Sequence, residues 1–258
     1  EQPRVTRCPV CGSKYISGFR AGTQQIEEAV KKMYPQARVL RMDMDTTAGK
    51  EGHEKILAAF SAQEADILVG TQMIVKGHDF PNVTLVGVLA ADMSLYAGDY
   101  RAAERTFELL TQAAGRAGRG KRAGEVVIQT YTPQHYSIAA AAAQNYEQFY
   151  EEEIAFRSIM DYPPVCNMLM VTISSKNEEQ LLAACTFLKE VIPEWKKEQV
   201  RITGPVAAGV YKRNDYYNQV VYLKATAYEK LTACKDRLEM LCRENTLFRS
   251  IGLQFDFN

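Results

Sequence analysis

The chain has 258 residues, enough for one large domain or two ordinary ones, and its 47% hydrophobic and 24% charged residues predict a globular protein with a sizeable core. Lys plus Arg and Asp plus Glu are equal at 31 each, and the resulting net charge of zero argues against a protein that only coats nucleic acid. The sequence has no apolar run of the roughly 18 residues that a membrane span needs and no signal-peptide pattern, so we expect no membrane partner.

Residues 1–20 form a short, polar segment that we interpret as an edge piece. It carries Cys8 and Cys11, the one closely spaced pair among six cysteines. The other four stand among apolar residues, as is typical of reduced cysteines in the core of a cytosolic protein. They are Cys166, Cys185, Cys234 and Cys242. We therefore expect a cytoplasmic location.

Helical and strand patterns alternate through residues 21–165. The predicted helices are 23–34, 50–62 and 101–116, and the predicted strands are 38–43, 65–70, 83–90 and 125–130. Short apolar strands that alternate with helices predict an α/β fold, with a parallel sheet and helices on both of its faces. Ligands of such sheets collect at the carboxyl ends of the strands.

A smaller α/β unit is predicted after the break at Pro163-Pro164. Residues 134–160, rich in Ala and Glu, are expected to form one or two connecting helices. The elements expected beyond the break are strands over 168–173, 200–203 and 219–224, and helices over 177–191 and 227–245. The expected domains are therefore residues 1–20, 21–165 and 166–258.

The loop after the predicted strand 65–70 carries residue types that bind phosphates and ribose. Gly77 lets the backbone approach a ligand closely, and the Asp79 carboxylate can accept a hydrogen bond from a ribose hydroxyl. The side chains able to donate to the phosphates of a nucleic acid are Thr71, Gln72 and Lys76. The alternative is an ordinary polar loop that caps the sheet.

Two arginines stand three residues apart at the end of the predicted helix 101–116. On a helical turn, Arg116 and Arg119 point the same way, and Gly115 and Gly118 remove bulk beside them. Planar guanidinium groups match the phosphate oxygens of a nucleotide. The alternative is a basic helix end, where Arg favours the negative end of the dipole and Gly stops the helix.

The segment between these two stretches, residues 91–105, follows a predicted strand and mixes aromatic, acidic and basic side chains. It is suited to contact both a nucleotide and DNA. A surface connection with local ion pairs explains the same composition equally well.

These stretches resemble motifs V and VI of superfamily 2 helicases. The residues that carry the resemblance are Gly-Thr-Gln-Met at 70–73, Lys-Gly-His-Asp-Phe-Pro at 76–81, and Gln-Ala-Ala-Gly-Arg-Ala-Gly-Arg at 112–119. The residues in these motifs are similar to those of the primosomal protein N′ (PriA) family of replication-restart helicases. Residues 22–24 and 41–47 resemble the start of the second RecA-like lobe of that family. The match covers most of residues 8–165. The remainder resembles the family more loosely, through 161–164, 204–205 and 212–213.

The resemblance implies the C-terminal part of an ATP-dependent 3′→5′ DNA helicase. Such a helicase recognises stalled forks and initiates primosome assembly for replication restart. The implied partners are forked and single-stranded DNA, single-strand-binding protein and primosome proteins. Carried onto this chain, Arg119 is expected to be the arginine finger and Arg116 its partner, with Gln112 nearby and Gly77 and Asp79 close to the nucleotide.

This chain departs from the family pattern in two respects. The family carries a zinc-binding insertion of four cysteine pairs, of which only Cys8 and Cys11 are present. A structural zinc needs four ligands, so we expect the chain to begin partway through the insertion and Zn²⁺ to bind in a longer protein. The sequence also lacks a Gly-x-x-x-x-Gly-Lys-Ser/Thr loop and an Asp-Glu-x-His magnesium motif. ATP and Mg²⁺ therefore need a first lobe, and we expect no ATPase activity from this chain alone.

In the smaller unit, two cations and two aromatic residues share a predicted turn between strands. Bases stack on aromatic rings and cations pair with phosphates, so this group suits single-stranded DNA. The four residues are Lys212, Arg213, Tyr216 and Tyr217. The alternative is that the two tyrosines are half-buried and only pack against the core. The resemblance also implies that this domain binds the acidic, aromatic tail of single-strand-binding protein.

Two other readings of the whole chain stay open at this point. One is a superfamily 2 lobe that acts on RNA, because motifs V and VI are shared across that superfamily. The other is a module that binds DNA or protein without any coupling to ATP.

Overall fold

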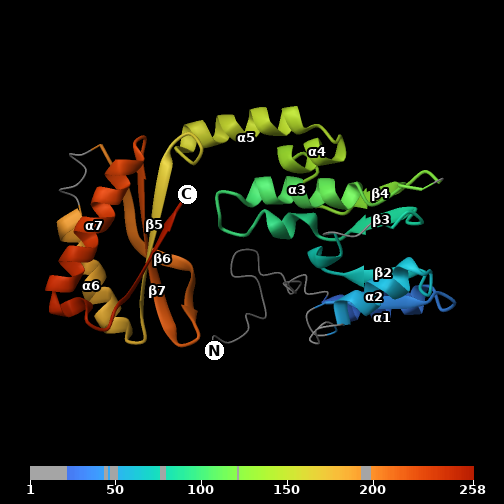
Figure 1. The fold of residues 1–258 in the computed structure, drawn as a ribbon, viewed down its shortest axis with the longest axis horizontal. Helices are drawn as coiled ribbons and strands as arrows, with labels where there is room; N and C mark the ends of the chain where they lie inside the picture. The colour runs from blue at the N-terminus through green and yellow to red at the C-terminus, as the bar shows by residue number, and fades with distance from the viewer. Residues whose placement is uncertain (1–21, 44–45, 47–51, 76–79, 121, 193–198) are drawn as a thin grey trace, which may run out of the picture. The chain divides into compact units, whose positions relative to one another are not determined.

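The computed structural model describes residues 22–43, 46, 52–75, 80–120, 122–192 and 199–258 (Figure 1). The chain divides into two compact units: one comprises the chain up to Leu89 with Leu109–Gln129, and the other comprises Ala90–Glu108 with Thr130–Asn258. Helix α3 (Ala102–Ala114) therefore belongs to both. The domain boundaries expected at residues 20 and 165 stay predictions. No described helix is long and apolar enough to span a membrane.

The first unit contains two parallel strand pairs, β1 with β2 and β3 with β4. Its remaining elements are two helices that flank β1 in the chain, a short 3-10 helix after β2 and the second half of α3. In chain order the elements are α1 (Thr23–Met33), β1 (Val39–Met42), α2 (Gly52–Ser61), β2 (Ile67–Gly70), η1 (Gln72–Val75), β3 (Leu85–Val88) and β4 (Glu125–Ile128). The predicted α/β class and parallel pairing are confirmed. Within the described residues, however, the pairs form two two-stranded sheets where we expected one continuous sheet.

A small apolar core holds the β1–β2 pair, its helices and the segment after η1 together. Met42, Leu57 and Phe80 are buried in it, and the rings of Phe60 and Phe80 meet edge to face with centroids 5.0 Å apart. Because Met42 ends β1 and Phe80 follows the loop after η1, this core anchors both sides of the sheet edge that carries the predicted loop.

The second unit begins with a helical layer. Its elements are η2 (Ala91–Ser94), the first half of α3, α4 (Tyr136–Ala142) and α5 (Tyr146–Met160). Asn145 caps α5 by accepting a hydrogen bond from the Gln148 amide. The ring of Phe107 on α3 stacks on Phe149 of α5, with centroids 4.2 Å apart, so α5 is held directly against the start of α3.

The rest of the second unit is a four-stranded antiparallel sheet with two helices, in the order β6-β7-β5-β8. The elements are β5 (Asn167–Ser175), α6 (Glu178–Val191), β6 (Arg201–Arg213), β7 (Tyr216–Ala225), α7 (Tyr228–Glu244) and β8 (Gly252–Phe257). A short 3-10 helix, η4 (Thr246–Phe248), precedes β8. The sequence patterns predicted neither β8 nor the full length of β6. Helix existence and order were predicted correctly.

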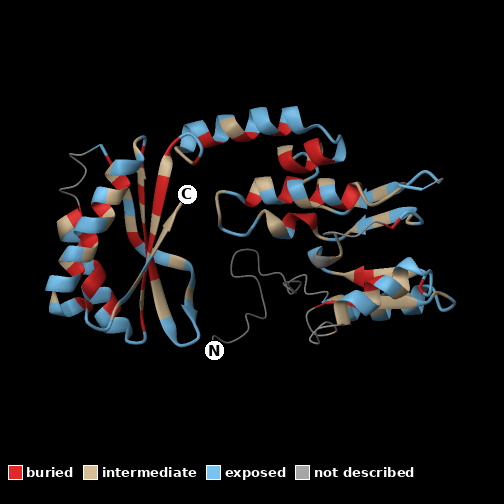
Figure 2. Cartoon of the chain, viewed as in Figure 1, coloured by how far each residue is buried: buried red, intermediate tan, exposed pale blue. Residues whose placement is uncertain are grey.

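Helices α6 and α7 cover one face of this sheet (Figure 1), and their buried sides point toward it (Figure 2). Helical spacing places four buried residues of α6 on that side: Leu181, Ala184, Cys185 and Leu188. They pack against Leu169, Val171 and Ile173 of β5, which alternate along the strand. This layer of side chains is the main core of the second unit.

Candidate functional site

The carboxyl end of β2 requires a glycine. A Cβ atom on Gly70 would lie 2.3 Å from the Met42 carbonyl oxygen and 2.5 Å from Ile74 Cδ1, so no other residue fits without movement. Thr71 and Gln72 follow directly and are exposed. Two of the three side chains predicted to contact phosphates, Thr71 and Gln72, are thus presented where parallel strands β1 and β2 end.

A buried carboxylate, which the sequence reading did not assign to the site, lies at the neighbouring strand end. Asp43 follows β1 and accepts hydrogen bonds from the Thr23 hydroxyl at the start of α1 and from the Thr46 amide and hydroxyl. The Thr23 bond, followed by those from Thr46, lowers the pKa of Asp43 to about 2. Arg41 Nε lies 3.5 Å from the same carboxylate. Asp43 therefore ties α1 to the carboxyl edge of the strand pair. The signal for it was its place at the end of the predicted strand 38–43.

The two predicted arginines lie in a turn just after α3. Arg116 is half-buried and Arg119 is exposed, while Gln112 is exposed on the last turn of the helix. The turn closes at Gly118, where φ is +73° and a Cβ would come 2.6 Å from the Gly124 amide nitrogen. Arg119 Nε donates to the Gly115 carbonyl at 2.5 Å. This contact matches the helix-end alternative for Arg119, and its exposure matches a ligand-facing role.

The fold brings the arginine turn, which is the second motif, against the end of the first motif and the residues that follow it. The Gly118 amide donates to the Val83 carbonyl at 3.0 Å. A Cβ on Gly120 would lie 2.1 Å from the Pro81 carbonyl oxygen, so the two backbones are in direct contact there. Stretches more than 30 residues apart in the printed sequence therefore meet at one place in the first unit.

Five predicted site residues lie outside the described residues: Cys8, Cys11, Lys76, Gly77 and Asp79. Among the described residues, no group of three or more His, Cys, Asp or Glu side chains is arranged to hold a metal. The described cysteines are buried and unbridged, as expected for reduced core cysteines. Burial raises the pKa of Cys185 to about 11 and that of Cys242 to about 12, so these thiols stay protonated. The described part of the chain therefore does not fit a zinc site.

The segment 91–105 combines a structural carboxylate with an exposed loop. Asp92 is buried and accepts hydrogen bonds from the hydroxyls of Thr130 and Thr132 and from the Tyr131 amide, which hold the pKa of its carboxyl well below the usual range. Asp99 pairs with Arg105, in agreement with the alternative of local ion pairs. Tyr96, by contrast, is 73% exposed.

The β6–β7 hairpin carries the four residues predicted to bind single-stranded DNA. Its turn, Asn214-Asp215, has positive φ at both residues, the geometry typical of a tight two-residue hairpin. Register pairs Lys212 with Tyr217 and Arg213 with Tyr216. Because side chains alternate along a strand, these pairs lie on opposite faces of the sheet. The four residues are close in sequence, but they do not form one patch.

The two faces of the hairpin differ in their contacts. On the helix side, Lys212 Nζ lies 3.1 Å from the Tyr217 hydroxyl and 4.6 Å from its ring centroid, and Tyr217 packs against the core. On the other face, Tyr216 is 42% exposed and Lys176 Nζ lies 5.3 Å from its ring centroid. Lys176 is a neighbour that sequence spacing missed, because it comes from the β5–α6 turn some 40 residues earlier.

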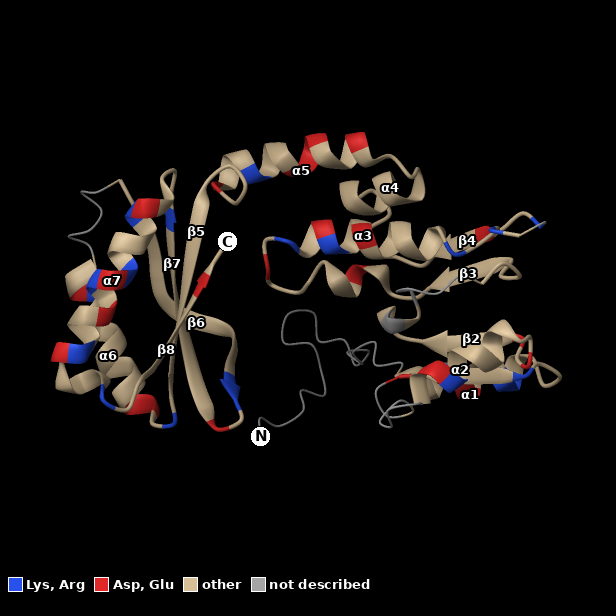
Figure 3. Cartoon of the chain, in the orientation of Figure 1, with Lys and Arg blue, Asp and Glu red and all other residues tan. Residues whose placement is uncertain are grey.

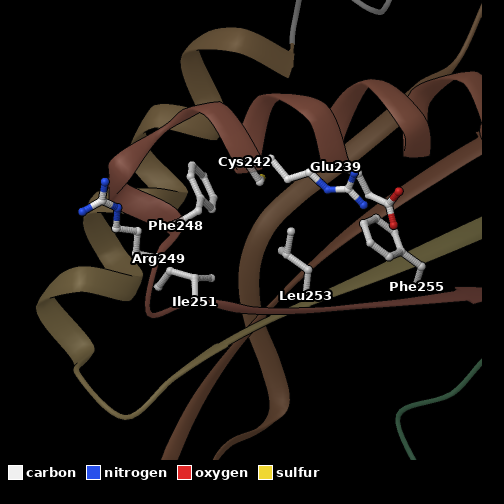
Figure 4. Close-up of a pocket in the computed structure, with 8 residues that line it drawn as sticks. Glu239, Cys242, Phe248, Arg249, Ile251, Leu253 and Phe255 are labelled. Carbon is white, nitrogen blue, oxygen red and sulfur yellow. The ribbon is translucent and has the colours of Figure 1, made fainter.

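A cavity of about 340 Å³ lies between the end of α7 and β8 (Figure 4). Phe248, Ile251 and Leu253 line it together with two arginines, Arg243 and Arg249. No residue of the predicted sites lines it. Lys and Arg are interspersed with Asp and Glu along the helices of both units (Figure 3), as the zero net charge leads one to expect.

Two family models match the chain. Residues 158–257 match "Primosomal protein N C-terminal domain", and residues 15–121 match "Helicase conserved C-terminal domain". The second match spans the arginine turn and the β2 loop, and the first spans the antiparallel sheet.

Several curated relatives carry the name "Replication restart protein PriA". The Bacillus subtilis protein is 47% identical over 249 residues, covering 95% of this chain and 30% of the relative. The Synechocystis protein is 39% identical over 241 residues, 93% of this chain and 29% of the relative. The Haemophilus influenzae protein is 34% identical over 221 residues, 84% of this chain and 30% of the relative. The chain thus spans about a third or less of these proteins.

Proposed function

Because this chain belongs to the PriA family of replication restart proteins, we propose that it supplies the second motor lobe and C-terminal domain of an ATP-dependent 3′→5′ DNA helicase. The helicase would recognise stalled forks and start primosome assembly. The observation that supports the motor assignment is the arginine turn after α3, which is packed against Pro81 and Val83 directly after the β2 loop. Motifs V and VI of a helicase need this proximity, because both act on one nucleotide and one DNA strand.

The residues of the turn fit a nucleotide bound from the opposite side. Arg119 is exposed and Arg116 is half-buried on the same glycine-relieved turn, and Gln112 is exposed one turn earlier. ATP, when bound, supplies the phosphoryl group whose transfer to water drives movement. Arg119 would stabilise the charge on that group, and Arg116 would orient it. Mg²⁺ and the phosphate loop would come from a first lobe, since this sequence has no Gly-x-x-x-x-Gly-Lys-Ser/Thr motif.

We also propose DNA and protein partners for both units of the chain. Thr71 and Gln72, together with Lys76, would contact the backbone of the translocating strand, and one face of the β6–β7 hairpin would contact single-stranded DNA. Single-strand-binding protein and primosome proteins are the proposed protein partners. Zinc would be held by Cys8 and Cys11 with two further ligands from a longer chain, and no step of the reaction is assigned to it.

The substitution Arg119→Ala in the full-length helicase tests the motor assignment. We expect ATP-driven unwinding of forked DNA to fall by about a thousandfold or more, the range that loss of an arginine finger produces, while the Kd for DNA stays unchanged. Arg122→Ala, an exposed arginine just beyond the turn, is the matched control and should unwind normally. Equal loss of DNA binding and unwinding in Arg119→Ala would count against a finger role.

A binding measurement, and not an ATPase assay, distinguishes a lobe that acts on DNA from the alternative of a lobe that acts on RNA. Fluorescence anisotropy with forked DNA, single-stranded DNA and RNA of equal length must use one stated salt concentration, because phosphate-driven affinity depends on salt. Preference for forked DNA supports the proposal. Preference for RNA would favour the alternative.

A further inference from the structure

The C-terminal sheet has one covered face and one free of helices. Val221 and Leu223 of β7 are buried in the core beneath α6 and α7. Their neighbours along the strand therefore point to the opposite face, where neither helix lies (Figure 1). Cross-strand register places Thr172 of β5 beside Val220, and Ser174 beside Asn218, on this helix-free face.

The chain itself covers one end of the helix-free face. Lys224 Nζ lies 3.6 Å from the ring centroid of Tyr162 and donates to the Met160 carbonyl at 3.0 Å. Tyr162 in turn stacks on Tyr100, with centroids 5.1 Å apart. Met168, the cross-strand partner of Lys224, is accordingly buried. Nothing else can bind at this end without displacing these rings.

The other end, beside the hairpin, is accessible. Arg213 and Tyr216 are exposed there. Farther across the sheet, the exposed Gln254 of β8 pairs with the half-buried Thr172, and its amide donates to the Asp256 carboxylate. Arg213 and Lys176 bring two positive charges to the Tyr216 ring, and Asp215 in the turn offsets part of this charge. An aromatic ring flanked by cations, on a flat surface with hydroxyl and amide groups, complements a single nucleic-acid strand.

We propose that single-stranded DNA crosses the helix-free face of the β6-β7-β5-β8 sheet, with a base stacked on Tyr216 and the adjoining phosphates beside Arg213 and Lys176. The inference rests on the proposed function and specifies which face of the C-terminal domain carries the strand. Strands spaced about 4.8 Å apart give the open half of the face room for two or three nucleotides. Thr172 and Gln254 lie along this path and contact the bases. Lys212 and Tyr217, on the covered side, are structural.

The hairpin supplies a matched pair of substitutions on neighbouring residues. Anisotropy with labelled oligo-dT, at one stated ionic strength, measures the Kd of this chain and its variants. Tyr216→Ala should weaken binding by about fivefold or more, the loss of one base–aromatic stack, whereas Tyr216→Phe should keep the affinity within about twofold. Arg213→Ala should weaken binding, and Lys212→Ala on the opposite face should not. Arg243→Ala, an exposed arginine near the end of α7, controls for loss of charge alone.

A second pair tests the middle of the path without touching the hairpin. Thr172→Glu places a larger, negatively charged side chain where a base should lie, and it should weaken binding of the negatively charged oligo-dT by about fivefold or more. Thr186→Glu places the same charge on the exposed side of α6 and should leave the Kd unchanged. Circular dichroism checks that each variant is folded. If Tyr216→Ala does not fold, the result for Thr172→Glu decides whether the strand crosses the helix-free face.

The outcomes separate this inference from the proposed function. If Lys212→Ala and Thr186→Glu weaken binding while Arg213→Ala and Thr172→Glu do not, the strand lies on the helix side and the inference is overturned, although DNA binding stands. If the unaltered chain binds no oligo-dT, the proposed DNA-binding role of this domain fails. If oligo-rU binds as tightly as oligo-dT and shows the same variant pattern, the face takes single strands of either kind, and the assignment to DNA is overturned.

Discussion

At the scale of single residues, the ionised carboxylate of Asp43 stabilises the carboxyl edge of the β1–β2 pair. Asp43 is buried and accepts hydrogen bonds from Thr23 and Thr46, which stabilise its charged form. Thr23 begins α1, so the carboxylate sets where that helix starts relative to the strand end. The sequence reading saw the acidic run only as a family resemblance, because the pairing of residues 20 positions apart cannot be read from spacing.

Asp43→Asn should lower the thermal midpoint of the chain at neutral pH, because the amide loses the ionic hydrogen bonds. Since the pKa of Asp43 is depressed to about 2 in the folded state, its stabilisation is complete above the ordinary carboxyl pKa of about 3.9. It is lost as the pH falls through the folded value. The difference between the two proteins, measured by calorimetry from pH 7 downward, should therefore shrink below about pH 4.

Asp236→Asn is the matched control for Asp43→Asn. Its carboxylate is exposed and its ion pair with Lys235 lies on the surface of α7, so the midpoint should hardly change at any pH. A pH-independent difference for Asp43→Asn would mean that its charge is not what stabilises the strand end.

At the scale of elements, α3 is the member that both units share. Near its start, Glu104 pairs with Arg157 of α5 at 2.7 Å, and Arg157 also pairs with Glu153 at 2.7 Å and donates to the Pro163 carbonyl at 2.9 Å. Arg157 is 7% exposed. Beyond its other end, the same helix leads into the turn with Arg116 and Arg119. The ion pairs of Arg157 therefore fix the start of α3 within the second unit.

Arg157→Met should destabilise the second unit by about 3–5 kcal/mol, because it leaves the buried Glu153 carboxylate without its cation. Urea unfolding followed by circular dichroism measures this change. Arg249→Met removes an exposed arginine and should stay within about 0.5 kcal/mol of the unaltered chain. Adding Glu153→Met to Arg157→Met should restore part of the lost stability, and a further loss instead would show that the ion pair is not the source.

At the scale of the whole molecule, the chain matches two family models, and its sequence contains no phosphate loop. It matches a helicase C-terminal domain model and a primosomal C-terminal domain model, and it spans about 30% of the length of the Bacillus subtilis relative. The arginine turn lies against Pro81 and Val83, but the sequence contains no Gly-x-x-x-x-Gly-Lys-Ser/Thr loop. We therefore propose that ATP turnover requires phosphate-binding groups from a first lobe.

The chain alone should hydrolyse ATP no faster than a buffer blank, with or without forked DNA. A coupled phosphate-release assay measures this, with a full-length PriA relative as the positive control. A DNA-stimulated rate of about 1 s⁻¹ or more, which is ordinary for an enzyme, would contradict the proposal that the phosphates are held elsewhere.

The sequence by itself determined the α/β class, the order of most elements and the family, because each depends on local patterns: apolar periodicity, helix stops and the contiguous wording of two motifs. It also identified Arg116, Arg119 and the hairpin residues as candidates. Strand β8 was not predicted, because it pairs with β5 some 80 residues earlier and no neighbouring strand in the sequence indicates it.

Only the tertiary structure decided which candidates lie together. Backbone contact at Pro81 and Gly120 joined the two motifs, and strand register sent Tyr216 and Tyr217 to opposite faces although they are adjacent in sequence. It also placed Lys176 beside Tyr216. A local sequence pattern indicates which residues of an element face a core. Contacts between distant segments depend on strand pairing and register, which are determined by residues spread over the whole chain.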